Sequence, residues 1–123
     1  MPTELEVVWI YHELITPPDY KMIVCLCQRL GLFININTKG FRRGSLPISK
    51  SQHGFLDHDS HLECGKVYEI DDYVIQQGRT IPGAHIHRQH IADILVQIER
   101  SAEISDDDKL AIREVLTPLI PST

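Results

Sequence analysis

The side chains most able to do chemistry are concentrated in the stretch from His53 to Ile70. Its first twelve positions hold eight polar or reactive groups: His53, Asp57, His58, Asp59, Ser60, His61, Glu63 and Cys64. Ser60 stands between Asp59 and His61 as in a nucleophilic triad, but neighbours on a strand point to opposite faces. Working triads are also assembled from separated segments. We therefore interpret Asp59 and Ser60 as structural residues whose short side chains bond the backbone where a strand begins.

Metal binding is a second candidate chemistry. The chain has two clusters of possible ligands, one of His85, His87 and His90 and one of His58, His61 and Cys64. Three such ligands and a water molecule form a catalytic zinc site. The spacings match no zinc signature, however, and seven histidines in 123 residues will cluster by chance. We therefore predict that the protein uses no metal and no other cofactor.

Cysteine usage and the lack of targeting signals favour a cytoplasmic protein without membrane contact. Cys25, Cys27 and Cys64 are an odd number of cysteines. The first two alternate with Val24 and Leu26, so both are expected on one face of a strand as buried, reduced thiols. The chain has no apolar run of about 18 residues. It also lacks an N-terminal basic segment followed by an apolar stretch.

Cleavage of an RNA phosphodiester is the sharper candidate chemistry. It needs a group that takes the proton from the 2′-hydroxyl, one that protonates the leaving oxygen, and a cation for the charged transition state. Lys21 begins one expected strand and Thr38 ends the next, so a hairpin would bring them together. The net charge of −5 does not attract nucleic acid to the whole molecule, but one connection is locally basic. It is expected to bind phosphate through Lys39, Arg42, Arg43 and Lys50.

The period of the hydrophobic pattern changes once along the chain. Before about residue 85, short runs alternate with a period of two, as in Leu32–Asn37, and turn residues separate them. After about residue 87, apolar residues recur at helical spacing, and Ser105 with three aspartates marks a second helix start. The chain is therefore predicted to be one α+β domain, 1–123, with a bent antiparallel sheet or barrel at about 4–85. The helices are predicted at about 87–101 and 105–117.

The chain resembles the MazF/PemK toxins, most closely over Phe55–Leu62. This segment, Phe-Leu-Asp-His-Asp-Ser-His-Leu, is similar to the family's apolar position, charged residues, Asp-Ser pair and apolar strand. Lys21 and the strand after it fall where the family has Arg-Pro and a Val/Leu-rich strand. The segment Leu32–Thr38 falls on a strand that ends in Thr or Ser. The order of elements is similar over Leu5–Leu95.

The resemblance implies an SH3-like small barrel that forms a homodimer and cleaves single-stranded RNA without a metal. In that family context, Lys21 would stabilise the transition state, Thr38 would bond the phosphate, and His12 or Glu13 would be the acid or base. Two features depart from the family. A lysine lacks the planar fork of the family's arginine, and residues 12–19 replace its Gly-rich loop. The alternative function is a non-catalytic barrel that binds a protein partner, such as an antitoxin-like chain.

Overall fold

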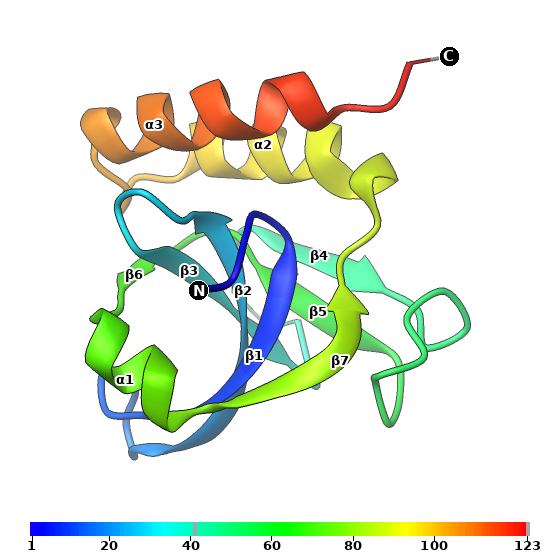
Figure 1. Cartoon of the computed structure of the whole chain (residues 1–123). Coiled ribbons are helices and arrows are strands. Elements are labelled where there is room, and N and C mark those ends of the chain that lie inside the picture. The colour runs from blue at the N-terminus through cyan, green and yellow to red at the C-terminus, as the bar shows by residue number, and fades with distance from the viewer. Residues whose placement is uncertain (41, 123) are drawn as a thin grey trace.

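The computed structural model describes residues 1–40 and 42–122, which form one antiparallel sheet and a layer of helices (Figure 1). The strands are β1 (Glu6–His12), β2 (Asp19–Cys27), β3 (Leu32–Asn37), β4 (Ser45–Ile48), β5 (Ser60–Glu63), β6 (Tyr68–Glu69) and β7 (Arg79–His85). Their order across the sheet is β4-β5-β3-β2-β1-β7. The short strand β6 pairs with the first two residues of β3, and β5 pairs with its last two. The predicted α+β class, with strands first and helices last, is confirmed.

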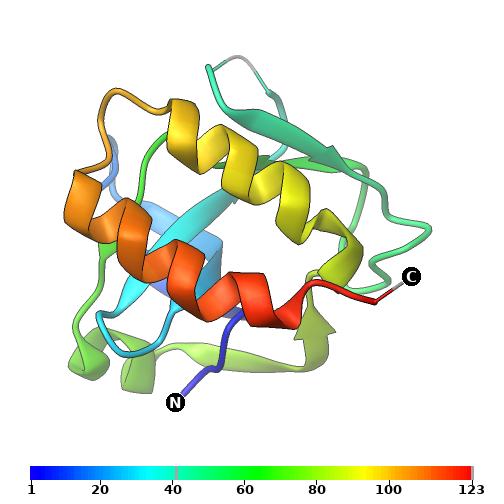
Figure 2. The same cartoon turned by 90° about the horizontal axis from the view of Figure 1, so that it is seen from above.

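Two helices lie side by side over the sheet, as the view from above in Figure 2 shows. They are α2 (Ile91–Arg100), which follows the 3-10 turn η1 (Arg88–His90), and α3 (Asp106–Leu116), which precedes the 3-10 turn η2 (Thr117–Leu119). The sequence places the first helix start near residue 87, but His87 is extended and the α-helix begins at Ile91. Ser105 caps α3, because its Oγ accepts a hydrogen bond of 3.1 Å from the backbone N–H of Asp108. Among the described residues, every helix is too short or too polar to cross a membrane.

The two faces of the sheet bury two separate cores. Residues opposite each other on paired strands share a face, so the strand register assigns each side chain to one of them. The larger core lies under the helices, where Val24, Ile34 and Leu62 from the strands meet Ile94 and Ile112 from α2 and α3. Burying one such aliphatic side chain contributes roughly 1.5–3 kcal/mol. This layer therefore fixes the helices on the sheet.

The smaller core lies on the opposite face, under α1 (Asp72–Gln77). It combines Ile10, Ile23 and Phe33 from three adjacent strands with Tyr68 and Ile75, which close it. These apolar residues cover only one end of the face. The other end is free to carry polar side chains, and the candidate site is built there.

A β-bulge in β2 overturns one prediction about the cysteines. Cys25 pairs with Phe33 and Cys27 pairs with Leu32, so β2 has one extra residue between these pairs. As a result Cys25 packs in the smaller core and Cys27 in the larger one. The expectation that both thiols share a face was wrong. All three cysteines are buried and free, as predicted.

The strand β7 bends where Pro82 and Gly83 interrupt its pairing with β1. Glu6 pairs with His85 while Val8 pairs with Thr80, so several residues of β7 bulge out opposite one residue of β1. Pro82 has no N–H to donate, and Gly83 adopts a φ of +73° that suits glycine. The bend lets the sheet curve. Its end strands β4 and β7 are not paired with each other in residues 1–40 and 42–122.

The polar stretch that begins at His53 is only partly sheet. Within it, β5 and β6 are two short strands joined near Gly65, whereas residues 49–59 form a connection rich in turns. Asp59 Oδ1 accepts a hydrogen bond of 2.9 Å from the Lys50 backbone N–H at the start of that connection. The Ser60 hydroxyl donates to the His58 carbonyl at 3.0 Å. Both side chains therefore bond the backbone where β5 begins.

Candidate functional site

Strand register gathers polar side chains at the end of the face that the smaller core leaves free. Asn35 and Asn37 lie on one face of β3, and continuing the β2–β3 pairing by two residues brings Lys21 opposite Asn37. On the other edge of β3, Asn37 pairs with His61. Glu63, two residues further along β5, is therefore on the same face. The start of β2, the end of β3 and the end of β5 thus meet.

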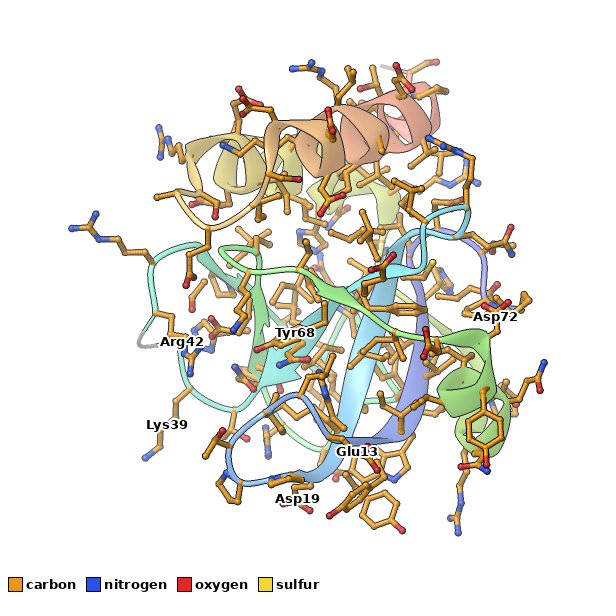
Figure 3. The ribbon with its side chains drawn as sticks, turned by 90° about the vertical axis from the view of Figure 1, so that its left-hand side faces the viewer. Glu13, Asp19, Lys39, Arg42, Tyr68 and Asp72 are labelled. Carbon is orange, nitrogen blue, oxygen red and sulfur yellow. The ribbon has the colours of Figure 1, made fainter. Side chains whose placement is uncertain are left out.

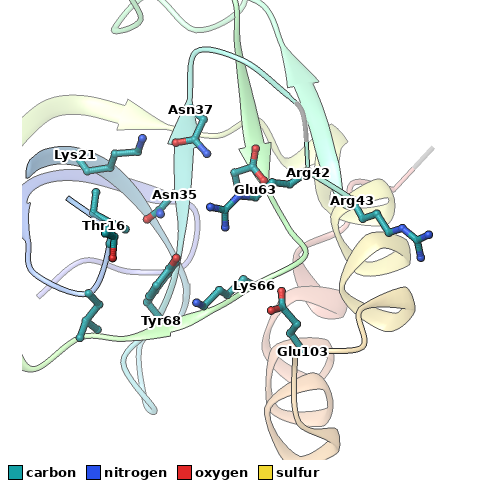
Figure 4. A pocket seen from close by; sticks show the side chains of 12 residues that line it. Thr16, Lys21, Asn35, Asn37, Arg42, Arg43, Glu63, Lys66, Tyr68 and Glu103 are labelled. Carbon is teal, nitrogen blue, oxygen red and sulfur yellow. The ribbon is translucent and has the colours of Figure 1, made fainter. Parts of the chain in front are cut away.

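These side chains line an open pocket of about 490 Å³, which we call the polar pocket. Further walls come from the β1–β2, β3–β4 and α2–α3 connections and from β6, whose Tyr68 lies near the centre of Figure 3. The polar residues of the lining are Thr16, Lys21, Asn35, Asn37, Arg42, Arg43, Glu63, Lys66, Tyr68 and Glu103 (Figure 4). Segments far apart in the sequence therefore contribute to one site.

Three cations face the polar pocket from different elements. In Figure 4, Lys21 extends from β2, Arg42 turns inward from the β3–β4 connection, and Lys66 lies beside Tyr68. The Lys66 Nζ is 5.0 Å from the centre of the Tyr68 ring, a cation–π distance. Among the described residues, the ion pair that forms links α2 with α3, and none involves these three cations. They are therefore available to an anionic ligand.

The surroundings of Lys21 change its acidity. Burial lowers the pKa of its ammonium group, the carboxylates of Glu63 and Asp19 oppose that shift, and the charge of Arg42 adds to it. An ammonium group with a lowered pKa is a better proton donor near neutral pH. Lys21 therefore combines a charge that can bind phosphate with a proton that it can give to a leaving oxygen.

Glu63 places a carboxylate in the wall of the polar pocket. The residue is only 6% exposed. Its Oε1 accepts a hydrogen bond of 2.8 Å from the hydroxyl of Ser45, the residue opposite it on β4. This bond orients the carboxylate from one side. The group can then accept a proton from a ligand on the side that faces the pocket.

His12 is fully buried at the end of β1 and borders the hollow next to the polar pocket. Its Nδ1 accepts a hydrogen bond of 3.3 Å from the Leu14 N–H, so the proton of the neutral ring is on Nε2. Burial lowers the pKa of the His12 imidazole, the neighbouring Asn35 amide opposes the shift, and Lys21 and Lys66 add to it. His12 Nε2 and Asn35 Oδ1 make no well-formed hydrogen bond with the described residues. His12 is thus neutral near pH 7 and does not line the polar pocket.

The other predicted site residues are divided between the pocket and its surroundings. Arg43 borders the polar pocket but points away from its centre in Figure 4. Thr38 and Lys39 are exposed after β3 and do not line the pocket, and Lys39 projects outward in Figure 3. Glu13 lines a neighbouring groove. The Lys50 Nζ donates to a backbone carbonyl of its own connection at 2.6 Å, so it holds that connection in place.

Histidines meet in a second place, where the β4–β5 connection contacts the chain before α2. His53 is buried, and its Nε2 accepts a hydrogen bond of 3.2 Å from the His87 N–H. The His53 ring centre lies 4.7 Å from that of His87 and 5.5 Å from that of His90. No three His, Cys, Asp or Glu side chains in residues 1–40 and 42–122 are arranged to hold a metal ion. The cluster ties the β4–β5 connection to the start of the helical layer.

Sequence reasoning did not identify Asn35, Asn37, Glu63, Lys66 or Tyr68 as site residues. The alternation in β3 indicated a polar face, which was a usable signal for the two asparagines. The position of Glu63 depends on the pairing of β5 with β3, a contact between distant segments that local patterns do not specify. As a whole, the site can hold an anion and move protons. In comparisons with known proteins, no protein-family model matches the chain and no curated protein matches its sequence.

Proposed function

We propose that this chain is a MazF/PemK-like small-barrel protein whose polar pocket binds single-stranded RNA and cleaves it. The proposal includes an SH3-like barrel and a homodimer, both of which the sequence resemblance implies. The curvature of the strands in Figure 1, with a second core on the face under α1, supports the barrel. The pocket supports the activity.

One observation carries the proposal: Lys21, Arg42 and Lys66, from three separate elements, face one pocket of about 490 Å³ and form no ion pair with the described residues. The chain has a net charge of −5, so this concentration of positive charge is local. A local group of cations in a recess is the electrostatic arrangement that binds phosphate. The amides of Asn35 and Asn37 add groups that can bond a sugar or a base.

The same pocket contains the groups that cleavage needs. Glu63 takes the proton of the 2′-hydroxyl, and the freed oxygen attacks the neighbouring phosphorus. The bond from phosphorus to the 5′-oxygen breaks as Lys21 gives its proton to that oxygen. Arg42 and Lys66 stabilise the charge that develops on the phosphate oxygens. The products are a 2′,3′-cyclic phosphate and a free 5′-hydroxyl. In this scheme Glu63 takes the role that the family context gives to His12 or Glu13, because Glu63 lines the polar pocket.

A cleavage assay on a mixed-sequence RNA, with the end groups identified by mass spectrometry, tests the proposal. We expect the protein to cleave RNA in the presence of a chelator. Lys21→Met should slow cleavage by at least about a hundredfold, because it removes both the charge and the proton donor. Lys109→Met is the matched control, since Lys109 lies on α3, outside the pocket. Intact RNA after long incubation with the unaltered protein would contradict the activity.

A second candidate function is a non-catalytic barrel that binds a protein partner, such as an antitoxin-like chain. The observation that favours it is the presence of two carboxylates, Glu63 and Glu103, in the same pocket. They repel phosphate and suit a Lys or Arg side chain of a partner. Recovery from the host of a protein whose binding is lost on Glu63→Gln, together with no binding of RNA, would select this function.

A further inference from the structure

A second surface lies on the other side of the β1–β2 connection, along α1. Two hollows of about 450 and 180 Å³ share Tyr11, Glu13 and Val74 in their linings, so they adjoin each other between α1 and the β1–β2 hairpin. In Figure 3, Glu13 marks the hairpin side and Asp72 marks the α1 side. We call the two hollows together the α1 groove; its main lining residues are Trp9, Tyr11, Glu13, Glu69, Tyr73 and Arg79.

One half of the α1 groove is aromatic. The Trp9 and Tyr20 rings are parallel with centres 6.3 Å apart, and Tyr11 meets Tyr20 edge-on at 5.2 Å. Tyr73 lines the same hollow from α1. The exposed fractions of Tyr11, Tyr20 and Tyr73 are 46%, 59% and 68%, so these rings are open to a partner. Tyr and Trp offer rigid contact area with a hydrogen-bond donor at the tip, and they lose little conformational entropy on binding.

The other half of the α1 groove is acidic. Glu13, Glu69 and Asp71 line its smaller hollow, and Arg79 is the one Lys or Arg that the described residues contribute to either lining. Three carboxylates in a recess repel phosphate and attract Lys or Arg. The α1 groove therefore presents aromatic rings in one hollow and negative charge in the hollow beside it.

We propose that the α1 groove binds an extended, proline-containing peptide segment that carries Lys or Arg. A polyproline II segment makes no internal hydrogen bonds, so its carbonyls are free to accept from tyrosine hydroxyls and the indole N–H. Its fixed shape matches grooves lined by aromatic rings. The basic side chain complements the carboxylates of Glu13, Glu69 and Asp71. This partner surface goes beyond the proposed function and shares no catalytic group with it.

The charges favour a peptide over nucleic acid in this groove. Exposed aromatic rings can also stack on the bases of single-stranded RNA. Such sites, however, combine the rings with a positively charged path for the backbone. In the α1 groove the charges lining the path are mainly negative. RNA is therefore expected in the polar pocket and a basic peptide in the α1 groove.

Trp9 makes this proposal measurable, because it is the only tryptophan of the chain and lines the aromatic half. Its fluorescence can be titrated with three ten-residue peptides that lack aromatic residues. The first is proline-rich with two arginines, the second has glutamates in place of the arginines, and the third has alanines in place of the prolines. We expect a saturable change with the first peptide at a micromolar dissociation constant, and binding at least about tenfold weaker for the other two.

Two variants separate groove binding from other effects. Tyr73→Ala should weaken the binding of the first peptide by about tenfold, as is common when a central aromatic contact is removed. Its side chain is mostly exposed, so the fold should persist by circular dichroism. Lys21→Met should leave the titration unchanged. Three results would each overturn the proposal: equal binding of the acidic peptide, no saturable response up to about 1 mM, or a Tyr73-dependent response to single-stranded RNA.

Discussion

The polar pocket and the α1 groove are neighbours with opposite chemistry. Leu14, in the β1–β2 connection, lines both of them. On one side of this connection three Lys and Arg side chains face the recess, and on the other side three carboxylates do. The net charge of −5 sums these two surfaces with the rest of the chain. The net charge of the whole chain therefore does not predict which ligand either surface binds. The charges that line each surface do.

The two regions are also built differently. The polar pocket takes its cations and its main carboxylate from β2, β5 and two connections, so it exists only when distant strands pair. The aromatic half of the α1 groove comes from one local hairpin and the short helix α1. Pairing within one hairpin positions Trp9, Tyr11 and Tyr20, whereas pairing between distant strands positions the residues of the polar pocket. Substitutions in the polar pocket should therefore change RNA cleavage and leave peptide binding in the α1 groove unchanged. Substitutions in the α1 groove should do the opposite.

The largest expected effect comes from Glu63→Gln. This change keeps the size of the side chain and its bond to Ser45 but removes the charge that accepts a proton. Loss of a general base slows a reaction by about a hundredfold to ten-thousandfold. RNA should bind as well as before or more tightly, because a repulsive charge is gone. Single-turnover cleavage and equilibrium binding, measured on the same RNA, separate the two effects.

The matched control for that experiment is Glu69→Gln, which removes a carboxylate from the α1 groove instead. It should leave RNA cleavage unchanged and weaken the binding of the arginine-containing peptide to the α1 groove. If both glutamine variants slow cleavage equally, the loss reflects overall charge, and the assignment of Glu63 fails. If Glu63→Gln cleaves at the unaltered rate while Lys21→Met does not, the activity stands and only the base has to be reassigned.

Most of the fold was predictable because its signals are local. The alternation of Leu32–Asn37 predicts β3, and Ser105 with its following aspartates predicts the start of α3; both elements are present. The exceptions arise where tertiary contacts override the local pattern. The bulge that separates Cys25 from Cys27 fits β2 to β3. Proline followed by glycine usually marks a turn, but Pro82 and Gly83 lie in a bulge that bends β7.

The candidate site was predictable only in part. The sequence and the family resemblance indicate Lys21 as the cation for the transition state and Arg42 and Arg43 as phosphate contacts, and all three border the polar pocket. Thr38 was predicted as the hairpin neighbour of Lys21, and Lys39 and Lys50 as phosphate contacts of the basic connection, and none of the three lines the polar pocket. Which residue enters a pocket depends on the direction of each side chain and on strand pairing over long separations. Neither is encoded in the spacing of residue types within one segment.

A change of pH should act on the connection that separates the two regions. His12 accepts the Leu14 N–H at Nδ1, and protonation would remove that acceptor. Burial lowers the pKa of His12, and burial likewise lowers the pKa of His53 and His90. Unfolded histidine has a pKa of about 6.5. Between the folded and the unfolded pKa the unfolded state binds more protons, so the free energy of unfolding rises with pH there. Stability should therefore be complete above about pH 6.5 and fall as the pH drops below it.

Urea unfolding at several pH values between about 5 and 8 measures this loss. His53→Gln should make the decline shallower, because one of the buried titrating groups is removed. Exchange of the Leu14 amide hydrogen should accelerate as the pH falls, after correction for the intrinsic exchange rate. Stability that stays constant toward pH 5 would show that folding leaves the pKa values of these imidazoles unchanged, and stability that rises would show that folding raises them; either result contradicts the prediction.

The smallest expected effect comes from two neighbouring arginines in one connection. Arg42 turns into the polar pocket and Arg43 points away from it (Figure 4). Replacing either by alanine removes the same charge from the same segment, so the overall field of the protein changes equally. Arg42→Ala should weaken RNA binding several-fold and reduce the salt dependence of the binding constant by about one unit of slope. Arg43→Ala should do clearly less in both measurements. Equal effects would mean that RNA binding depends on the total charge of the connection. That result would contradict the assignment of the polar pocket as the RNA-binding site.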